Sequence, residues 1–130
     1  MRDRGPSLLI VEDDESLRRI LARHLRGQGY DVTEATSAEE AVAVLVEGLR
    51  PALVLLDLNL PGDTGWDLLR GPALGGAGSP PVVITSATTV SPKRLAEFHI
   101  AGYLPKPFPL ETLLATIERL QMPDGRGKEA

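Results

Sequence analysis

Residues 53–57 read Leu-Val-Leu-Leu-Asp, a run of apolar side chains that ends abruptly in a carboxylate. An apolar run without alternation is typical of a strand that is buried on both faces, as in a parallel sheet covered by helices. Two other short runs end in a similar way: residues 10–11 precede two acids, and residues 82–85 precede Ser86. The pattern predicts neighbouring parallel strands whose carboxyl ends carry polar side chains.

The rest of the chain alternates between strand-like and helix-like patterns. Together with the three runs above, the expected strands cover residues 7–11, 30–35, 52–56, 82–86 and 103–106. Helix patterns separate them, at residues 17–25, 37–45, 66–70, 92–98 and 109–120. This alternation predicts an α/β fold: a doubly wound parallel sheet of five strands, flanked by helices on both faces.

The third helix pattern is cut short. Gly71 and Pro72 follow it directly, and Pro cannot continue the backbone hydrogen bonds of a helix. Residues 75–80 are rich in Gly and Pro. We therefore expect a long loop before the strand at residues 82–86.

Length and charge narrow the class of protein. A chain of 130 residues fits one domain; we expect it over residues 1–122, with 123–130 as a polar tail or the start of a linker. The net charge of −4 argues against direct nucleic-acid binding, which needs a concentrated basic surface. The chain has no cysteine, which excludes disulfides and thiolate metal sites. No apolar stretch has the length of a membrane span, so we expect a cytoplasmic protein without membrane contact.

The polar residues that follow the expected strands should meet at one edge of the sheet, where open α/β folds place their sites. Acids crowded at such an edge repel each other unless a divalent cation neutralises them, and Mg²⁺ prefers oxygen ligands. Asp13 and Asp57 are candidates for direct ligands, with Glu12 acting through water. The backbone carbonyl of Asn59 is a further candidate ligand. The sequence therefore predicts a Mg²⁺ site, which Mn²⁺ would also fit.

A carboxylate beside such a cation can attack a phosphoryl group while a lysine takes up charge on the phosphoryl oxygens. Asp57 is the candidate nucleophile. Lys106 is the natural cation and Ser86 the natural hydroxyl donor, because both follow or end neighbouring strands.

Four strings in this order resemble the receiver domain of two-component response regulators. They cover most of residues 7–121 and read Val-Glu-Asp-Asp-Glu at 11–15, Leu-Leu-Asp-Leu-Asn-Leu-Pro-Gly at 55–62, Ile-Thr-Ser-Ala at 84–87, and Tyr-Leu-Pro-Lys-Pro-Phe at 103–108. Each string alone is weak, but four in order at these spacings are specific. The resemblance implies a flavodoxin-like sheet with strand order 2-1-3-4-5.

The resemblance also implies a role for each residue of the cluster. Asp57 is the phosphoacceptor, with a histidine kinase as donor, and Glu12 and Asp13 form the Mg²⁺-binding acid pair. Ser86 and Tyr103 are the switch residues. Pro107 corresponds to a proline that follows the lysine through a cis peptide bond, which an X-Pro bond permits at modest cost.

The function implied is a phosphorylation-dependent signalling switch rather than an enzyme that turns over a separate substrate. Its chemistry would be limited to phosphotransfer to Asp57 and loss of that phosphoryl group. The output surface would combine the helix near residues 92–98, the strand at 103–106 and the last helix, and would contact a downstream protein or effector domain. The third helix is clipped and the segment from 86 to 106 is short, so this surface departs from the usual family pattern. A phosphorylation-dependent dimer through it stays an open alternative.

The same residues also fit other readings. The acids at 12–15 could simply favour a helix start, and Asp57 could be an ordinary turn aspartate. A phosphatase of the haloacid dehalogenase type wants a second acid and a Thr where this chain has Asn59 and Pro61. The remaining alternatives are a receiver module cut from a longer, for example DNA-binding, regulator, and a pseudo-receiver that acts only through protein contacts. The kinase, the signal and the output partner are not encoded in any motif of the chain.

Overall fold

The computed structural model describes residues 5–76, 78–98 and 100–121, and the expected tail at 123–130 lies outside them. Five parallel strands form a single sheet in the order β2-β1-β3-β4-β5. Their bounds are β1 Ser7–Val11, β2 Asp31–Ala35, β3 Leu53–Asp57, β4 Val82–Ser86 and β5 Gly102–Pro105. The predicted fold class and the strand order are both confirmed.

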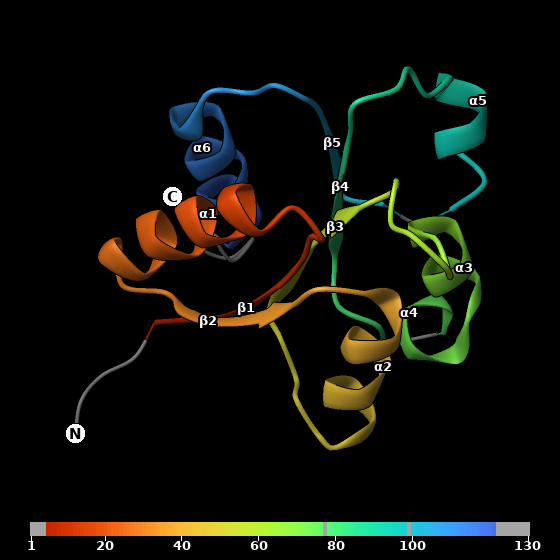
Figure 1. The fold of residues 1–130 in the computed structure, drawn as a ribbon, viewed down its shortest axis with the longest axis horizontal. Coiled ribbons are helices and arrows are strands. Elements are labelled where there is room, and N and C mark those ends of the chain that lie inside the picture. Colours follow the sequence, from red (N-terminus) through yellow and green to blue (C-terminus); the bar gives the residue numbers. More distant parts are fainter. Residues whose placement is uncertain (1–4, 77, 99, 122–130) are drawn as a thin grey trace, which may run out of the picture.

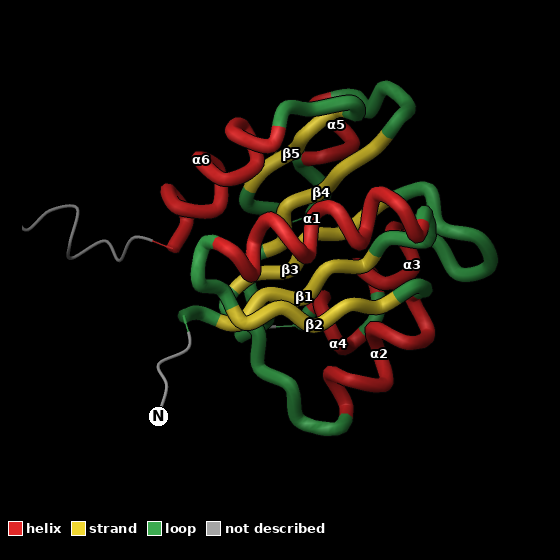
Figure 2. The backbone as a smooth tube through the Cα atoms, turned by 60° about the vertical axis from the view of Figure 1, so that its left-hand side comes forward, coloured by secondary structure: helices red, strands yellow, loops and turns green. Residues whose placement is uncertain are grey.

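Helices cover the two faces of this sheet (Figure 1, Figure 2). The helices are α1 Glu15–Gly27, α2 Ala38–Val46, α3 Gly65–Arg70, α4 Pro72–Gly75, α5 Pro92–Leu95 and α6 Leu110–Gln121. Helices α1 and α6 lie on one face, and α2, α3, α4 and α5 lie on the other (Figure 1). The described helices include none that could span a membrane.

Alternate residues of the inner strands point to opposite faces, and each face has its own core. In β1, Leu8 and Ile10 belong to the core under α1 and α6, whereas Leu9 and Val11 belong to the core under α2 and α3. Every residue of β3 and of β4 is buried. Burial on both faces explains why these strands are continuous apolar runs in the sequence.

Local sequence signals fix several helix ends. Asp14, Ser37, Thr64 and Ser91 are N-caps whose side chains accept a hydrogen bond from a backbone N–H in the first turn of α1, α2, α3 and α5. In α2 the Glu40 amide donates to Ser37 Oγ, and the Glu40 carboxylate accepts from the amide and hydroxyl of Thr36. The side chains of Ser37 and Glu40 therefore both bind the backbone at the start of α2.

The structure differs from the expected helices in two places. Pro72 does not only end a helix: it occupies the first turn of a new one, α4, where its fixed φ suits the start and its missing N–H costs nothing. Helix α5 starts at Pro92 as expected but ends at Leu95, short of residue 98. Strand β5 ends at Pro105, so Lys106 lies just beyond it. As an edge strand, β5 tolerates Pro105.

Candidate functional site

The carboxyl ends of four strands meet at one edge of the sheet. Strand β1 leads into Glu12 and Asp13, β3 ends in Asp57, and β4 ends in Ser86. The register places Asp57 beside Thr85 and Ser86 beside Pro105, the residue before Lys106. The parallel sheet thus brings together residues that are up to 94 positions apart in the chain.

Three carboxylates form the centre of this edge. Glu12, Asp13 and Asp57 each offer a carboxylate oxygen, and these oxygens lie within 4.8 Å of one another. Glu12 and Asp57 are each 3% exposed, whereas Asp13 is exposed. Oxygen donors this close together are the ligand set that Mg²⁺ and Mn²⁺ favour, so the residues present fit such a cation.

Lys106 provides the positive charge of the cluster. Its Nζ lies 2.8 Å from Glu12 Oε1 and 3.3 Å from Asp57 Oδ2. Burial alone would lower the pKa of this ammonium, but the hydrogen bond and charge of Glu12, together with the charge of Asp57, outweigh burial and raise the pKa. Lys106 is therefore held as a cation between two acids. The Lys106–Pro107 peptide bond is cis.

Glu12 is buried and is the acid of the cluster that lies nearest the Lys106 ammonium. Burial raises the pKa of its carboxyl, and the charge of Asp57 acts in the same direction. The hydrogen bonds from Lys106 and from the Asp14 amide oppose this rise without cancelling it. Two buried carboxylates share one ammonium, which leaves the cluster short of positive charge.

Asp57 has its two oxygens in different environments. Oδ1 accepts a hydrogen bond from the Asn59 amide at 2.9 Å, and Oδ2 faces Lys106. The loop behind it must approach closely, because a Cβ on Gly65 would lie 2.7 Å from the Asp57 carbonyl oxygen and 2.8 Å from Leu58 Cα. Gly65 thus allows α3 to begin directly against the end of β3. Gly65 directly precedes the expected helix at residues 66–70, and no sequence pattern gave it a role.

Ser86 forms its hydrogen bonds with Asn59 and Thr88 and not with the carboxylates of the described cluster. Its Oγ lies 2.9 Å from Asn59 Oδ1 and 3.0 Å from the Thr88 carbonyl oxygen, and its single proton serves one of them at a time. The Tyr103 hydroxyl donates to the same Thr88 carbonyl at 3.3 Å. Thr88 therefore joins both candidate switch residues. The sequence had given no signal for it beyond its position two residues after Ser86.

Arg18 is a second residue that sequence reasoning missed. It is 8% exposed, and its guanidinium donates to the Glu12 carbonyl oxygen at 3.3 Å and to Glu34 Oε1 at 3.0 Å. Because Glu34 lies on β2, this ion pair joins α1, the end of β1 and the neighbouring strand. No sequence pattern singles out Arg18, because only the strand register brings its partner Glu34 beside α1.

Trp66 links α3 to the segment around α5. Its ring centroid lies 5.4 Å from that of Phe98, and Arg94 Cζ lies 4.4 Å from the Trp66 ring centroid. Arg94 also pairs with Glu97 at 2.6 Å. The only tryptophan of the chain is therefore placed to report on the position of α5.

Comparison with known proteins agrees on one family. The model of the response regulator receiver domain matches residues 8–118. The chain is 34% identical over 124 residues to the uncharacterized transcriptional regulatory protein YkoG of Bacillus subtilis, covering 94% of this chain and 54% of that protein. It is 38% identical, with the same shares covered, to the DNA-binding response regulator MtrA of Mycobacterium tuberculosis H37Rv. The chain thus spans about half the length of the curated relatives it matches.

Solved structures match over nearly their whole length. A CheY-like receiver domain protein from Methanospirillum hungatei superposes with a TM-score of 0.79 at 27% identity, covering 96% of this chain and 98% of the other. The receiver domain of the hybrid histidine kinase CckA gives 0.74 at 33% identity, covering 88% and 97%. The chain therefore combines the fold of these receiver domains with the strand-end cluster described above.

Proposed function

Because the chain belongs to the response regulator receiver domain family of two-component systems, we propose that Asp57 accepts a phosphoryl group from a histidine kinase. The observation that carries this proposal is the buried Asp57 carboxylate between two further carboxylates and the Lys106 ammonium. The chemistry takes place on the protein itself, so the site is the input of a switch and not a pocket for a substrate that is turned over. We propose the cytoplasm as the location of this reaction.

The transfer uses the cluster as a preorganised acceptor. A carboxylate oxygen of Asp57 attacks the phosphorus of a phosphohistidine; the new P–O bond forms as the P–N bond breaks, and the imidazole leaves and takes up a proton. Lys106 stands 3.3 Å from Asp57 Oδ2 and would bind an oxygen of the incoming group. Attack of water on the phosphoryl group later returns free Asp57 and inorganic phosphate.

A divalent cation belongs in this proposal. Glu12, Asp13 and Asp57 would hold Mg²⁺ or Mn²⁺, with the Asn59 backbone carbonyl as a further ligand. When bound, the ion neutralises charge on the carboxylates and on the transferring phosphoryl oxygens. The shortage of positive charge around Glu12 supports this assignment.

Ser86 and Tyr103 would convert the new charge into a change of shape. A phosphoryl group on Asp57 offers strong acceptor oxygens, which compete for the Ser86 proton with Asn59 and Thr88. Movement of Ser86 would disturb Thr88, which also binds the Tyr103 hydroxyl. The readout surface is then α5, β5 and α6, which would contact a downstream protein or effector domain and is a candidate for dimerisation on phosphorylation.

We assign residues 1–122 to the receiver domain and residues 123–130 to a tail or linker. The relatives that carry a regulatory or DNA-binding name are about twice as long as the matched segment. An effector function such as theirs would therefore depend on a segment outside the receiver domain, and we propose none for the receiver domain itself.

Intact-mass spectrometry tests the assignment. The chain is incubated with acetyl phosphate, with and without Mg²⁺, beside an Asp57→Asn variant. We expect one added phosphoryl group in the wild type, less without the cation, and none in the variant. A wild type that takes up no phosphoryl group, or an adduct that persists in Asp57→Asn, would overturn the proposal.

A further inference from the structure

Helix α2 is apolar on nearly all sides. Its only polar residues, Glu39 and Glu40, lie in the first turn, and the remaining residues are Ala, Val and Leu. A helix that is hydrophobic all round is normally buried. In α2, however, Val42 is 38% exposed and Val46 is 75% exposed. These two valines make the outer face of α2 an apolar surface without a cover in the described chain.

A groove runs along this exposed face. Ala38, Val42 and Val46, which follow one another at intervals of four residues and so form one stripe of the helix, line one wall. The other wall consists of Leu68 and the turn at residues 71–73, where the chain passes from α3 into α4. The groove has a volume of about 290 Å³. The break at Gly71–Pro72, between the two short helices α3 and α4, forms part of the wall opposite α2.

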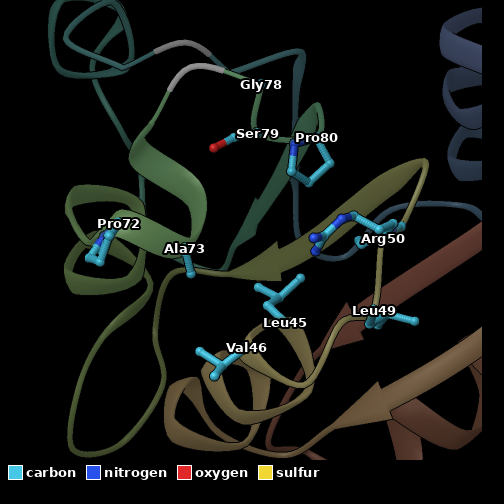
Figure 3. Close-up of a pocket in the computed structure, with 10 residues that line it drawn as sticks. Leu45, Val46, Leu49, Arg50, Pro72, Ala73, Gly78, Ser79 and Pro80 are labelled. Atoms are coloured by element: carbon cyan, nitrogen blue, oxygen red, sulfur yellow. The ribbon is translucent and has the colours of Figure 1, made fainter.

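The groove continues past the end of α2. A second hollow of about 460 Å³ shares Val46, Pro72 and Ala73 with the first (Figure 3). Leu45 and Arg50 line this second hollow and project toward it in Figure 3. The combined trough is apolar in its first hollow and includes Arg50 and Ser79 in its second. It follows α2 over its whole length of roughly 13 Å, at a rise of about 1.5 Å per residue.

Charge is distributed unevenly along the trough. Asp63 and Asp67 line the end near the first turn of α2, and no Lys or Arg is among the described residues that line that end. The charge of Glu39 raises the pKa of the exposed Asp63 carboxyl, so two acids crowd each other there. Asp67 has a partner, because Arg70 lies 3.3 Å from its Oδ1. Arg50 marks the opposite end with the reverse sign.

We propose that this trough binds an amphipathic helix of a partner protein, with apolar side chains between α2 and α4 and Lys or Arg at the Asp63 end. An apolar groove bordered by a helical stripe is the form in which proteins receive the apolar face of a helix. The acidic end selects a basic partner. A second copy docking through the same face would need Asp63 of one copy to face Arg50 of the other, and this alternative predicts a dimer that depends on Val46. The site uses no residue of the Asp57 cluster and goes beyond the proposed function.

Two designed peptides test the proposal. Both are fluorescein-labelled, Ala-rich helices with Leu at every third or fourth position along one face; one carries Lys at one end and the other carries Glu at the same positions. Fluorescence anisotropy measures their binding to the full chain. We expect the Lys peptide to bind more tightly than the Glu peptide, with an affinity that falls as salt is raised.

Substitutions locate the site. Val46→Asp should weaken binding of the Lys peptide by about tenfold or more, because it removes an apolar contact and places a charge in the trough. The matched control is Ile20→Asp, since Ile20 is 53% exposed and belongs to α1, the helix that lies on the opposite face of the sheet from α2 (Figure 1). Asp63→Lys should reverse the preference, so that the Glu peptide binds better. Circular dichroism verifies that each variant is folded.

Four results would overturn the proposal: no binding of either peptide, equal binding of both, an equal loss in Ile20→Asp, or a Val46-dependent dimer of the chain in sedimentation. Val46→Asp should still accept a phosphoryl group from acetyl phosphate. Failure of the trough and failure of the proposed function are therefore separate observations.

Discussion

The ammonium of Lys106 lies closer to Glu12 than to Asp57, at 2.8 Å against 3.3 Å. Before phosphorylation, then, the lysine is bound mainly by an acid that we assign to cation binding, and only secondarily by the acceptor. A phosphoryl group on Asp57 would compete for this lysine. Both the stability of the domain and its response to phosphorylation should depend on this relationship.

Replacing Lys106 by Met should destabilise the domain. The change leaves two buried carboxylates without their ammonium, and losing one partner of a buried charged hydrogen bond costs about 2–3 kcal/mol. Urea unfolding in EDTA measures the loss. Added Mg²⁺ should raise the stability of Lys106→Met more than that of the wild type. The exposed Lys93→Met serves as control and should unfold like the wild type; equal stabilities of Lys106→Met and the wild type in EDTA would contradict the account.

Replacing Ser86 by Ala should separate phosphorylation from the response. The Ser86 hydroxyl contacts Asn59 and Thr88 and, within the described part of the chain, makes no hydrogen bond to Asp57, so the acceptor carboxylate stays intact. We expect Ser86→Ala to take up the phosphoryl group while losing most of the accompanying change in Trp66 fluorescence. Thr89→Ala, an exposed hydroxyl nearby, is the control. An unchanged fluorescence response in Ser86→Ala would refute the switch role of Ser86.

Two glycines should respond oppositely to alanine. At Gly65 the added Cβ would lie 2.7 Å from the Asp57 carbonyl oxygen, so overpacking should cost about 1–3 kcal/mol. At Gly27, at the end of α1, the added Cβ meets nothing within 4 Å, and the better helix propensity should be neutral or stabilise by up to about 1 kcal/mol. Chemical denaturation of both variants checks the contrast. Equal changes in the free energy of unfolding would contradict this, because they would mean that α3 can shift away from β3 at no cost in stability.

The entry of α2 should weaken in acid. The amide and hydroxyl of Thr36 donate to Glu40 Oε1 at 2.7 and 2.9 Å and hold the pKa of Glu40 below its ordinary value of 4.5. Because the folded pKa is the lower one, the stabilisation is complete above pH 4.5 and is lost as the pH falls through the folded pKa. Glu40→Ala should therefore lower Tm at pH 7, and its difference from the wild type should close in acid. Glu47→Ala, which removes an exposed acid just after α2, is the control and should not lower Tm at pH 7.

Much of the fold was readable because a covered parallel sheet imposes simple patterns. Buried strands such as β3 and β4 are unbroken apolar runs, and polar residues follow them where the chain leaves the core. The strand order came from the family resemblance and is confirmed. Helix α4 was missed because four residues are too few for a periodic pattern, and Pro72 signals both the end of one helix and the start of another.

The partners within the site were harder to predict than its members. Arg18 reaches Glu34 on β2 and the Glu12 carbonyl, and only the register of the sheet brings these groups together. The Thr88 carbonyl oxygen accepts hydrogen bonds from both Ser86 and Tyr103, and a backbone carbonyl cannot be recognised from the type of residue that carries it. Side-chain chemistry at strand ends can be inferred from a sequence, whereas contacts made through backbone carbonyls require the structure.

The central claim is that Asp57 is the residue that carries the phosphoryl group. Borohydride reduces an aspartyl phosphate to homoserine, so a protein treated with acetyl phosphate and Mg²⁺, reduced, digested and sequenced by mass spectrometry keeps a permanent mark at the acceptor. We predict homoserine at position 57 and at no other aspartate, and none when the phosphodonor is omitted. Homoserine at Asp13 or Asp63 in place of Asp57, or an unmodified residue 57 in a protein that has gained phosphate, would contradict the account.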